Sequence, residues 1–141
     1  QLEKICNYVD AGKKEGGSIY QSSFSVPKKG YWYPPTLFTD VSQSHRIVQE
    51  EIFGPVLAIQ TFRTIDEAII KANNTPYGLS GGVWTDKGSK IFQVTREIRA
   101  GVIWANTFNK FDPGSPFGGY KESGVGREGG IEGLSPYVKL D

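Results

Sequence analysis

The amino-acid sequence predicts an α/β fold, an open parallel sheet with flanking helices built on a β-α-β-α-β unit. Two observations predict this class. Apolar segments of strand length lie at 56–62, 79–85 and 102–105, and segments with helical periodicity lie between them. Strands that alternate with helices pair in parallel through right-handed crossovers. With 141 residues, of which 38% are hydrophobic, the chain is long enough for one domain with a core.

The first expected element is an amphipathic helix at the start of the chain. Its apolar residues follow the i, i+3, i+4, i+7 spacing of one helix face: Leu2, Ile5, Cys6 and Val9. We expect Gly12, and then the glycines at 16–17, to end this helix. Because Cys6 lies on the apolar face, we interpret it as a buried structural thiol. A reactive thiol needs an exposed, electropositive setting.

Edge or irregular structure is expected next. Residues 18–29 are polar with short apolar alternation, which favours an edge hairpin or a loop. The aromatic segment 31–38 favours a strand, but Pro34 and Pro35 cannot donate to a β-ladder and confine it to an edge or an irregular stretch. The strand at 56–62 is continuously apolar, as strands buried on both faces are.

Local signals mark the two helices that follow. Thr64 and Glu67 form a capping box that starts the first helix, and the sequence Asn-Asn-Thr-Pro at 73–76 stops it. The second helix has two candidate N-caps and a glycine expected to end it: Asp86, Ser89 and Gly101.

The segment beyond the third strand is the expected ligand-binding region. Residues 106–130 are rich in glycine and aromatic residues, and ligands of open parallel sheets bind beyond the carboxyl ends of the strands. Four aromatic residues argue against disorder in this segment: Phe108, Phe111, Phe117 and Tyr120. Residues 129–141 are expected to form a short helix and then the start of a strand at 137–140.

Composition excludes several classes of function. The net charge of +1 gives no field that would draw the chain to nucleic acid or to an anionic membrane. One Cys excludes an internal disulfide framework and a Cys-based zinc site, and no metal site is expected. No apolar run approaches the ~20 residues of a membrane span. Met is absent and Gln1 falls inside the helical pattern, so we expect a piece of a longer protein.

Two further features are interpreted as structural. Residues 124–129 match G-x-G-x-x-G, but no buried strand leads into them and the chain ends before an acidic residue at the required spacing. We therefore interpret them as turn glycines rather than as a dinucleotide-binding fingerprint. His45, the sole imidazole, has no obvious nucleophile beside it and is expected on the surface.

Residues 50–55, Glu-Glu-Ile-Phe-Gly-Pro, are more informative. Two carboxylates lead into an aromatic residue and a Gly-Pro turn, which fixes where Glu51 and Phe53 point. A carboxylate can accept hydrogen bonds from two ribose hydroxyls, and an aromatic ring beside it can support a flat ring. Spacing alone leaves a second interpretation open, and favours it: a turn at the start of a strand with solvated acids.

Several stretches taken together resemble the NAD(P)-dependent aldehyde dehydrogenase family. The strongest are residues 50–56 (EEIFGPV) and 115–124 (SPFGGYKESG), and the order and spacing of that family continue at 35–41, 72–79 and 101–106. The resemblance covers essentially the whole chain. It implies that residues 1–141 are one partial domain, most of the second half of an aldehyde dehydrogenase-like catalytic domain.

The resemblance implies an oxidoreductase that oxidises a small-molecule aldehyde to a carboxylic acid with NAD or NADP, through a cysteine thiohemiacetal and thioester. The nucleophilic Cys and the general-base Glu of the family fall upstream of Gln1, so no catalytic residue is expected here and the chain alone is expected to be inactive. By the same resemblance, Glu51 would hydrogen-bond the nicotinamide ribose and Phe53 would pack near that ribose and ring. Phe111 and Phe117 would line the aldehyde tunnel.

The resemblance also implies a cytoplasmic homo-oligomer, a dimer or tetramer, with residues 136–141 as the possible start of an oligomerisation strand. Asn106 would shape the loop that leads into the tunnel, or would serve the fold alone. Two alternatives stay open. One is a catalytically dead homologue that acts as a scaffold or interaction module, and the other is an independent small binding domain.

Overall fold

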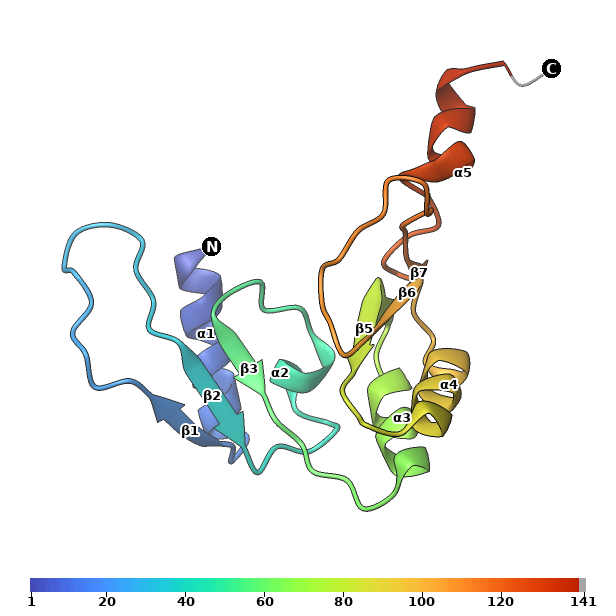
Figure 1. Ribbon diagram of the computed structural model, residues 1–141. Helices are drawn as coiled ribbons and strands as arrows, with labels where there is room; N and C mark the ends of the chain where they lie inside the picture. The colour runs from blue at the N-terminus through green and yellow to red at the C-terminus, as the bar shows by residue number, and fades with distance from the viewer. Residues whose placement is uncertain (140–141) are drawn as a thin grey trace. The chain divides into compact units, whose positions relative to one another are not determined.

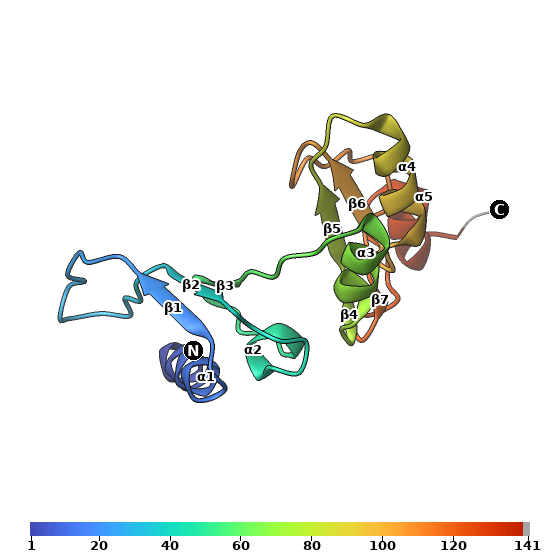
Figure 2. The same cartoon turned by 90° about the horizontal axis from the view of Figure 1, so that it is seen from below.

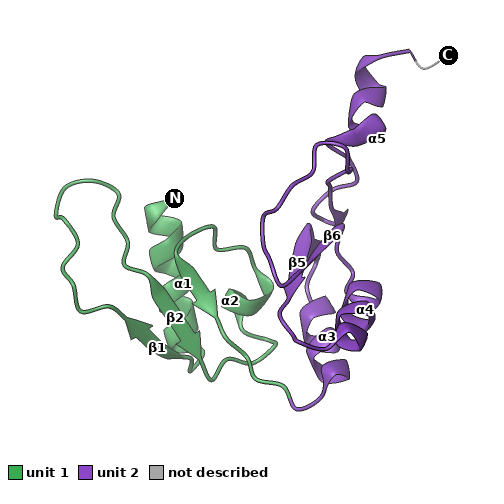
Figure 3. Ribbon diagram, in the orientation of Figure 1, with its two compact units in different colours: residues 1–62 green, residues 63–141 purple. Residues whose placement is uncertain are grey.

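The computed structural model describes residues 1–139, and the chain divides into two compact units, residues 1–62 and 63–141 (Figure 3). The first unit carries α1 (Leu2–Lys14), β1 (Ser18–Gln21), β2 (Thr36–Thr39), α2 (Arg46–Gln49) and β3 (Val56–Ala58). The second carries α3 (Ile65–Asn73), β4 (Tyr77–Gly78), β5 (Ser80–Val83), α4 (Gly88–Glu97), β6 (Val102–Ala105), β7 (Tyr120–Lys121), α5 (Gly130–Leu134) and the 3₁₀ helix η1 (Ser135–Tyr137) (Figure 1).

A three-stranded sheet in the order β1-β2-β3 organises the first unit. β1 runs antiparallel to β2, with Ser18 opposite Thr39, and β3 runs parallel to β2. Both α1 and α2 lie on one face of this sheet (Figure 2). The side chains of β2 alternate between its two faces, so Phe38 is fully buried in the core while Leu37 is exposed.

The core of the first unit joins both helices to the sheet. Its buried members are Ile5, Tyr8, Val9, Phe38, Ile47 and Ile52. Gly12 extends the buried stripe of α1, and a Cβ there would lie 2.8 Å from Cδ1 of Ile47, so a larger residue would require the Ile47 side chain to move. The expected helix end at Gly12 is therefore wrong. The helix runs on to Lys14 and is followed by Gly16 with a φ of +94°.

Cys6 is exposed, so the prediction of a buried thiol is wrong. The buried face of α1 is formed by Ile5, Tyr8, Val9 and Gly12. Successive helical residues are rotated by about 100°, which places Cys6 beyond the edge of that stripe.

The predictions about the strands of this unit are partly wrong. Residues 31–35 are irregular, as one of the two alternatives for the aromatic segment predicts, but residues 36–38 belong to β2, which is the central strand of its sheet and not an edge. Pro34 and Pro35 precede β2 and so remove no hydrogen bond from its ladder. The apolar segment at 56–62 is not buried on both faces: β3 is three residues long, and Leu57 is more than half exposed.

In the second unit, β5 and β6 pair in parallel with α4 between them in the chain, and Ser80 lies opposite Val102. The α/β class, with parallel strands and flanking helices, is therefore confirmed. The described strand pairs fall within the two units. Among residues 1–139, β3 pairs with β2 in one sheet, β5 with β6 in another, and β4 with β7 in a third.

The predicted start of α3 is confirmed. Thr64 is its N-cap, and the Thr64 hydroxyl accepts a hydrogen bond from the Glu67 N–H at 3.2 Å. The Glu67 carboxylate accepts from the Arg63 N–H at 2.8 Å, one residue before the position that a capping box requires. The helix ends at Asn73, as the Asn-Asn-Thr-Pro sequence predicts.

The predicted caps of α4 are wrong. Lys87 occupies the N-cap position and no side chain caps the helix. The helix also ends before the expected glycine, because Ile98 already has an extended ψ of 128°. Within the described part of the second unit, Ile69 and Trp104 are the buried hydrophobic residues, and α4 has none.

The chain ends differently from the prediction as well. Tyr137 belongs to η1, and residues 138–139 have no regular structure, so the strand expected at 137–140 does not begin where predicted. Leu140 and Asp141 lie outside the described residues. Up to residue 139, no helix is both long and apolar enough to cross a membrane.

Candidate functional site

Residues 50–55 connect α2 to β3, and their side chains alternate in environment. Glu50 and Ile52 contact the rest of the first unit, whereas Glu51 and Phe53 are exposed. The two neighbouring acids are therefore in different environments, which the sequence could not distinguish.

Glu50 is engaged within the fold. Nε and Nη2 of Arg46 donate to its two carboxylate oxygens at 2.8 and 2.9 Å, and the Tyr8 hydroxyl donates to Oε2 at 2.9 Å. These hydrogen bonds, first those from Arg46 and then that from Tyr8, lower the pKa of the Glu50 carboxyl from its ordinary 4.5 to about 2. Glu50 is thus a structural acid that ties α2 to α1.

The next residues are fixed by the N-terminal end of the chain and by the core. The Gln1 side-chain amide donates to the carbonyl oxygens of Ile52 at 3.0 Å and of Phe53 at 2.7 Å. Ile52 is buried in the core. A Cβ on Gly54 would lie 2.5 Å from Cδ1 of Ile5, so a larger residue at this position would require the Ile5 side chain to move.

Glu51 and Phe53 are the side chains that remain for a ligand. The Glu51 carboxylate makes no hydrogen bond or ion pair with any described residue. Phe53 is 74% exposed and has a φ of +56°, a region that bulky side chains rarely adopt. Glu50 therefore has a role in the fold. Glu51 is exposed, which both interpretations left open by the sequence, a solvated acid in a turn and a ribose contact, allow.

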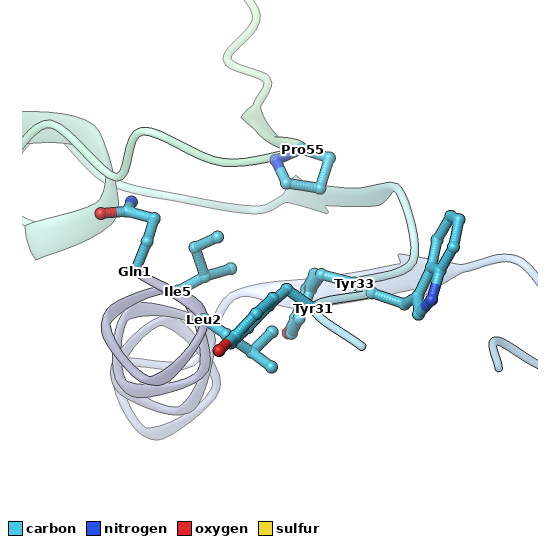
Figure 4. A pocket seen from close by; sticks show the side chains of 7 residues that line it. Gln1, Leu2, Ile5, Tyr31, Tyr33 and Pro55 are labelled. Carbon is cyan, nitrogen blue, oxygen red and sulfur yellow. The ribbon is translucent and has the colours of Figure 1, made fainter. Parts of the chain in front are cut away.

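A pocket of about 470 Å³ adjoins this turn at Pro55. Its other walls come from the start of α1 and from the aromatic segment before β2: Gln1, Leu2, Ile5, Tyr31, Trp32 and Tyr33 (Figure 4). Glu51 and Phe53 do not line this pocket.

In the second unit, Phe111 and Phe117 belong to a cluster of four rings. The centroid of Trp104 lies 4.9 Å from that of Phe108, 5.5 Å from Phe111 and 6.4 Å from Phe117. Phe111 and Phe117 are 5.0 Å apart at an interplanar angle of 82°, an edge-to-face arrangement that aromatic pairs favour. The Trp104 indole is buried and donates to the Lys110 carbonyl at 2.9 Å, so it anchors the cluster at β6.

The two predicted tunnel residues differ in exposure and in how their backbone is held. Phe111 is 58% exposed, whereas Phe117 is half-buried and exchanges two backbone hydrogen bonds of 2.7 Å with Glu128. The next residue, Gly118, has no room for a side chain, because a Cβ there would overlap the Gly126 carbonyl. A Cβ on Gly101 would in turn overlap the Gly118 carbonyl. The backbone around Phe117 is therefore packed against its neighbours.

Asn106 ties the ends of β5 and β6 together. Its side-chain amide donates to the Thr85 carbonyl at 3.0 Å and accepts from the Thr85 N–H at 2.9 Å. Its φ of +52° turns the chain out of β6 at this point, and Asn tolerates that conformation better than most residues. This geometry gives Asn106 a structural role at the start of the loop that carries the four rings.

Two members of the ring cluster were not predicted as site residues. The sequence analysis places Trp104 in a strand and uses Phe108 only as an argument against disorder of the loop. The available signal was the spacing of aromatic residues at 104, 108, 111 and 117, directly after an apolar strand.

The other sequence features behave as structural elements. Gly124 and Gly129 have φ values of +98° and +70°, as turn glycines do, and the Arg127 guanidinium donates to the Gly119 carbonyl at 3.0 Å. His45 is the N-cap residue of α2 and is partly buried, so its expected surface position is only partly right. Within residues 1–139, no three His, Cys, Asp or Glu side chains are grouped so as to hold a metal ion.

The aldehyde dehydrogenase family profile matches residues 1–141. The chain belongs to the aldehyde dehydrogenase family. Aldehyde dehydrogenase 1 of Tanacetum cinerariifolium is 46% identical to this aldehyde dehydrogenase chain over 140 residues, which are 99% of the chain and 28% of that relative.

Solved aldehyde dehydrogenases share the fold. The NAD⁺ complex of an aldehyde dehydrogenase from Bacillus cereus superposes with a TM-score of 0.92 at 43% identity, over 98% of this chain and 28% of that one. Indole-3-acetaldehyde dehydrogenase of P. syringae, solved in complex with NAD⁺ and IAA, gives a TM-score of 0.92 at 39% identity, over 99% and 29%. The aldehyde dehydrogenase chain studied here thus spans less than a third of the length of these relatives.

Proposed function

We propose that this chain is the part of an NAD(P)⁺-dependent aldehyde dehydrogenase that positions the nicotinamide ribose and lines the aldehyde tunnel. The observation that carries the proposal is the turn at residues 50–55, which buries or pairs Glu50 and Ile52 and displays Glu51 and Phe53. Solved relatives in complex with NAD⁺ support the choice of cofactor class.

Glu51 and Phe53 fit a nucleotide sugar chemically. A carboxylate with no partner within the described chain can accept hydrogen bonds from the two hydroxyls of a ribose, and an exposed ring can pack against the sugar and a flat heterocycle. When bound, the cofactor supplies the hydride acceptor for aldehyde oxidation. The contribution of these two residues is to hold the acceptor ring in place, which is a positioning effect.

Phe111 and Phe117 are proposed as walls of the aldehyde site. Their edge-to-face contact presents an apolar surface at the carboxyl end of β6, where parallel sheets bind ligands. Such a wall excludes water and accommodates an apolar or cationic substrate. The substrate class is a small-molecule aldehyde.

The chemistry itself is proposed to need residues outside this chain. Aldehyde, NAD(P)⁺ and water give the carboxylic acid, NAD(P)H and a proton, and a thiolate must first add to the carbonyl to make hydride departure feasible. Cys6 is the single thiol here. It lies on α1 in the first unit, and the residues around it do not match those around the family nucleophile. We therefore propose that the nucleophile and the general base come from other parts of the full-length protein.

A homo-oligomeric full-length protein is also part of this proposal, with residues 136–141 as the segment that leads into an exchanged strand. Deletion of residues 136–141 and of everything that follows them is expected to lower the oligomeric state measured by light scattering. An unchanged assembly would contradict the role of this segment.

The decisive test is Glu51→Gln in the full-length protein. Loss of a hydrogen bond to a charged group costs about 1.5–3 kcal/mol, so we expect kcat at saturating NAD⁺ to fall about ten- to a hundredfold and more than cofactor binding weakens. The matched control is Glu3→Gln, which alters another exposed acid of the first unit and should leave turnover unchanged. Unchanged turnover in Glu51→Gln would refute the proposed role.

A further inference from the structure

Residues 117–128 form a turn that is closed by its own hydrogen bonds. Phe117 and Glu128 exchange two backbone hydrogen bonds of 2.7 Å where the two ends of the turn meet. Inside the turn, the Arg127 guanidinium donates to three carbonyl oxygens of the same turn at 2.8 to 3.2 Å. These contacts fix the internal shape of the turn, but they do not fix where the turn lies against the rest of the second unit.

The turn is attached to residues 73–78, the segment that connects the end of α3 to β5. β7, which lies within the turn, pairs antiparallel with β4 of this segment (Figure 2). The Glu122 N–H also donates to the Pro76 carbonyl at 3.1 Å. The Ser123 hydroxyl accepts from the Gly78 N–H at 3.0 Å. Because Gly78 is buried, its N–H needs this partner inside the protein, and Ser123 is fixed at the segment by that need.

Lys121 joins the same turn to the end of a helix. Its ammonium group donates to the carbonyl oxygens of Asn73 and Thr75, each at 3.0 Å. Asn73 is the last residue of α3, and the last carbonyls of a helix have no partner within it and carry the negative end of its dipole. A cation is therefore favourable at this place, and the two hydrogen bonds from Lys121 are of the strong, charge-assisted kind.

The segment 73–78 also holds the chain that leads into β6. The side-chain amide of Asn73 donates to the Glu97 carbonyl at 2.8 Å and accepts from the Arg99 N–H at 2.7 Å. The Gly101 N–H donates to the carbonyl of the last residue of the segment at 3.0 Å. The strand that carries the buried indole of the ring cluster and the turn that carries its last ring are therefore fixed to one common segment.

We propose that Lys121 and Ser123 are positioning residues for the Phe117 wall of the aldehyde site. They attach the turn to the segment that also leads into β6, and so they fix the Phe117 ring relative to Trp104, whose ring centroid lies 6.4 Å away. This inference rests on the proposed function. Neither side chain belongs to the ring cluster, so both would affect aldehyde selectivity through the placement of Phe117.

The test uses Lys121→Met and Ser123→Ala in the full-length protein, with NAD⁺ and aldehydes from acetaldehyde to octanal as probes. The first variant keeps most of the apolar stem and removes the charged donor, and the second removes one hydroxyl. A displaced wall loses contacts mainly with long substrates. Each variant is therefore expected to lower the ratio of kcat/KM for octanal to that for acetaldehyde by about 3- to 10-fold, the equivalent of one or two ordinary hydrogen bonds.

Lys90→Met is the matched control, because Lys90 is an exposed lysine of α4 in the same unit, and it should leave the ratio unchanged. A double-mutant cycle separates positioning from a general loss of stability. If Lys121 acts through Phe117, Lys121→Met should no longer alter the ratio in a Phe117→Ala background.

An equal shift in both backgrounds would overturn the positioning role and leave the proposed function intact. An unchanged ratio in Lys121→Met and Ser123→Ala, with or without a lowered melting temperature, would do the same. If Phe117→Ala by itself leaves the ratio unchanged, the proposed role of Phe117 fails first.

Discussion

Glu50 and Glu51 are adjacent and chemically identical, and their environments give them different properties. Glu50 is held by Arg46 and Tyr8, which lower its carboxyl pKa to about 2, while Glu51 has no partner in the described chain. The difference arises because the backbone between α2 and β3 presents one acid to α1 and the other to solvent. At the scale of single residues, the fold engages Glu50 and leaves Glu51 exposed for the proposed ribose contact.

Phe53 allows the backbone strain to be measured. In the left-handed region an L-residue costs about 1–2 kcal/mol, whereas glycine is free of that cost but loses about 0.5–1 kcal/mol more entropy on folding. We therefore expect Phe53→Gly to be more stable than Phe53→Ala by about 0.5–1 kcal/mol, as measured by urea unfolding of the full-length protein.

The control for this comparison is Phe24, an exposed ring of the same unit whose φ is not positive. There the ordinary order should hold, with Phe24→Ala more stable than Phe24→Gly. An alanine variant at 53 that is as stable as the glycine variant would show that the turn stores no strain.

At the scale of elements, the local signals around α3 predict its bounds, whereas those at Gly12 and at the start of α4 do not. The parallel pairing of β5 with β6 follows from the alternation of strands and helices, but the pairing of β2 does not. Thr64 and the Asn-Asn-Thr-Pro sequence delimit α3 within a few residues of themselves, so the sequence was sufficient there. The central position of β2 depends on which strands pair with it, and hydrogen bonds between segments far apart in the chain leave no mark in a local pattern. The same holds for the site: Glu51 and Phe53 could be selected from their motif, but the contacts of Gln1 and Tyr8, 52 and 42 residues away, could not.

The loop after β6 carries a second prediction. Truncation of a fully buried Phe costs about 3–5 kcal/mol, and Phe117 is only half-buried at the edge of its cluster. We expect Phe117→Ala in the full-length protein to lose less stability than that. It should change kcat/KM unevenly across a series from acetaldehyde to octanal, because a wall contacts long and short substrates differently.

Melting temperature and the aldehyde series are measured on the same preparations. Phe92→Ala is the control, since Phe92 on α4 is 77% exposed and lies outside the ring cluster. A large loss of stability in Phe117→Ala with a uniform change across the series would assign this ring to the core and remove it from the tunnel.

At the scale of the whole molecule, the chain covers 28% of the length of its relative and leaves much apolar surface exposed. Phe92, Ile70 and Trp84 of the second unit are each more than 60% exposed, and α4 buries no residue completely. An amphipathic helix normally buries its apolar stripe against another element. The described part of the second unit therefore has a small hydrophobic core.

The chain by itself is expected to produce no NADH from NAD⁺ and propanal. The reason is that a thiolate placed against the aldehyde is required, and Cys6 stands on an exposed helix surface of the first unit. Absorbance at the NADH band, with the full-length protein as positive control, measures this directly. NADH formation that disappears in Cys6→Ser would contradict the expectation and make Cys6 the nucleophile.

The glycine packing around Phe117 has a consequence for how this part of the family fold could diverge. Positions 101 and 118 have no space for any side chain, because each would collide with a backbone carbonyl. A substitution at either position would distort the loop, so the backbone around Phe117 tolerates few changes. Phe111 belongs to the same cluster, but its side chain and its neighbours in the chain are exposed. If the proposed aldehyde site is right, changes of substrate preference would be expected at position 111 rather than at position 117.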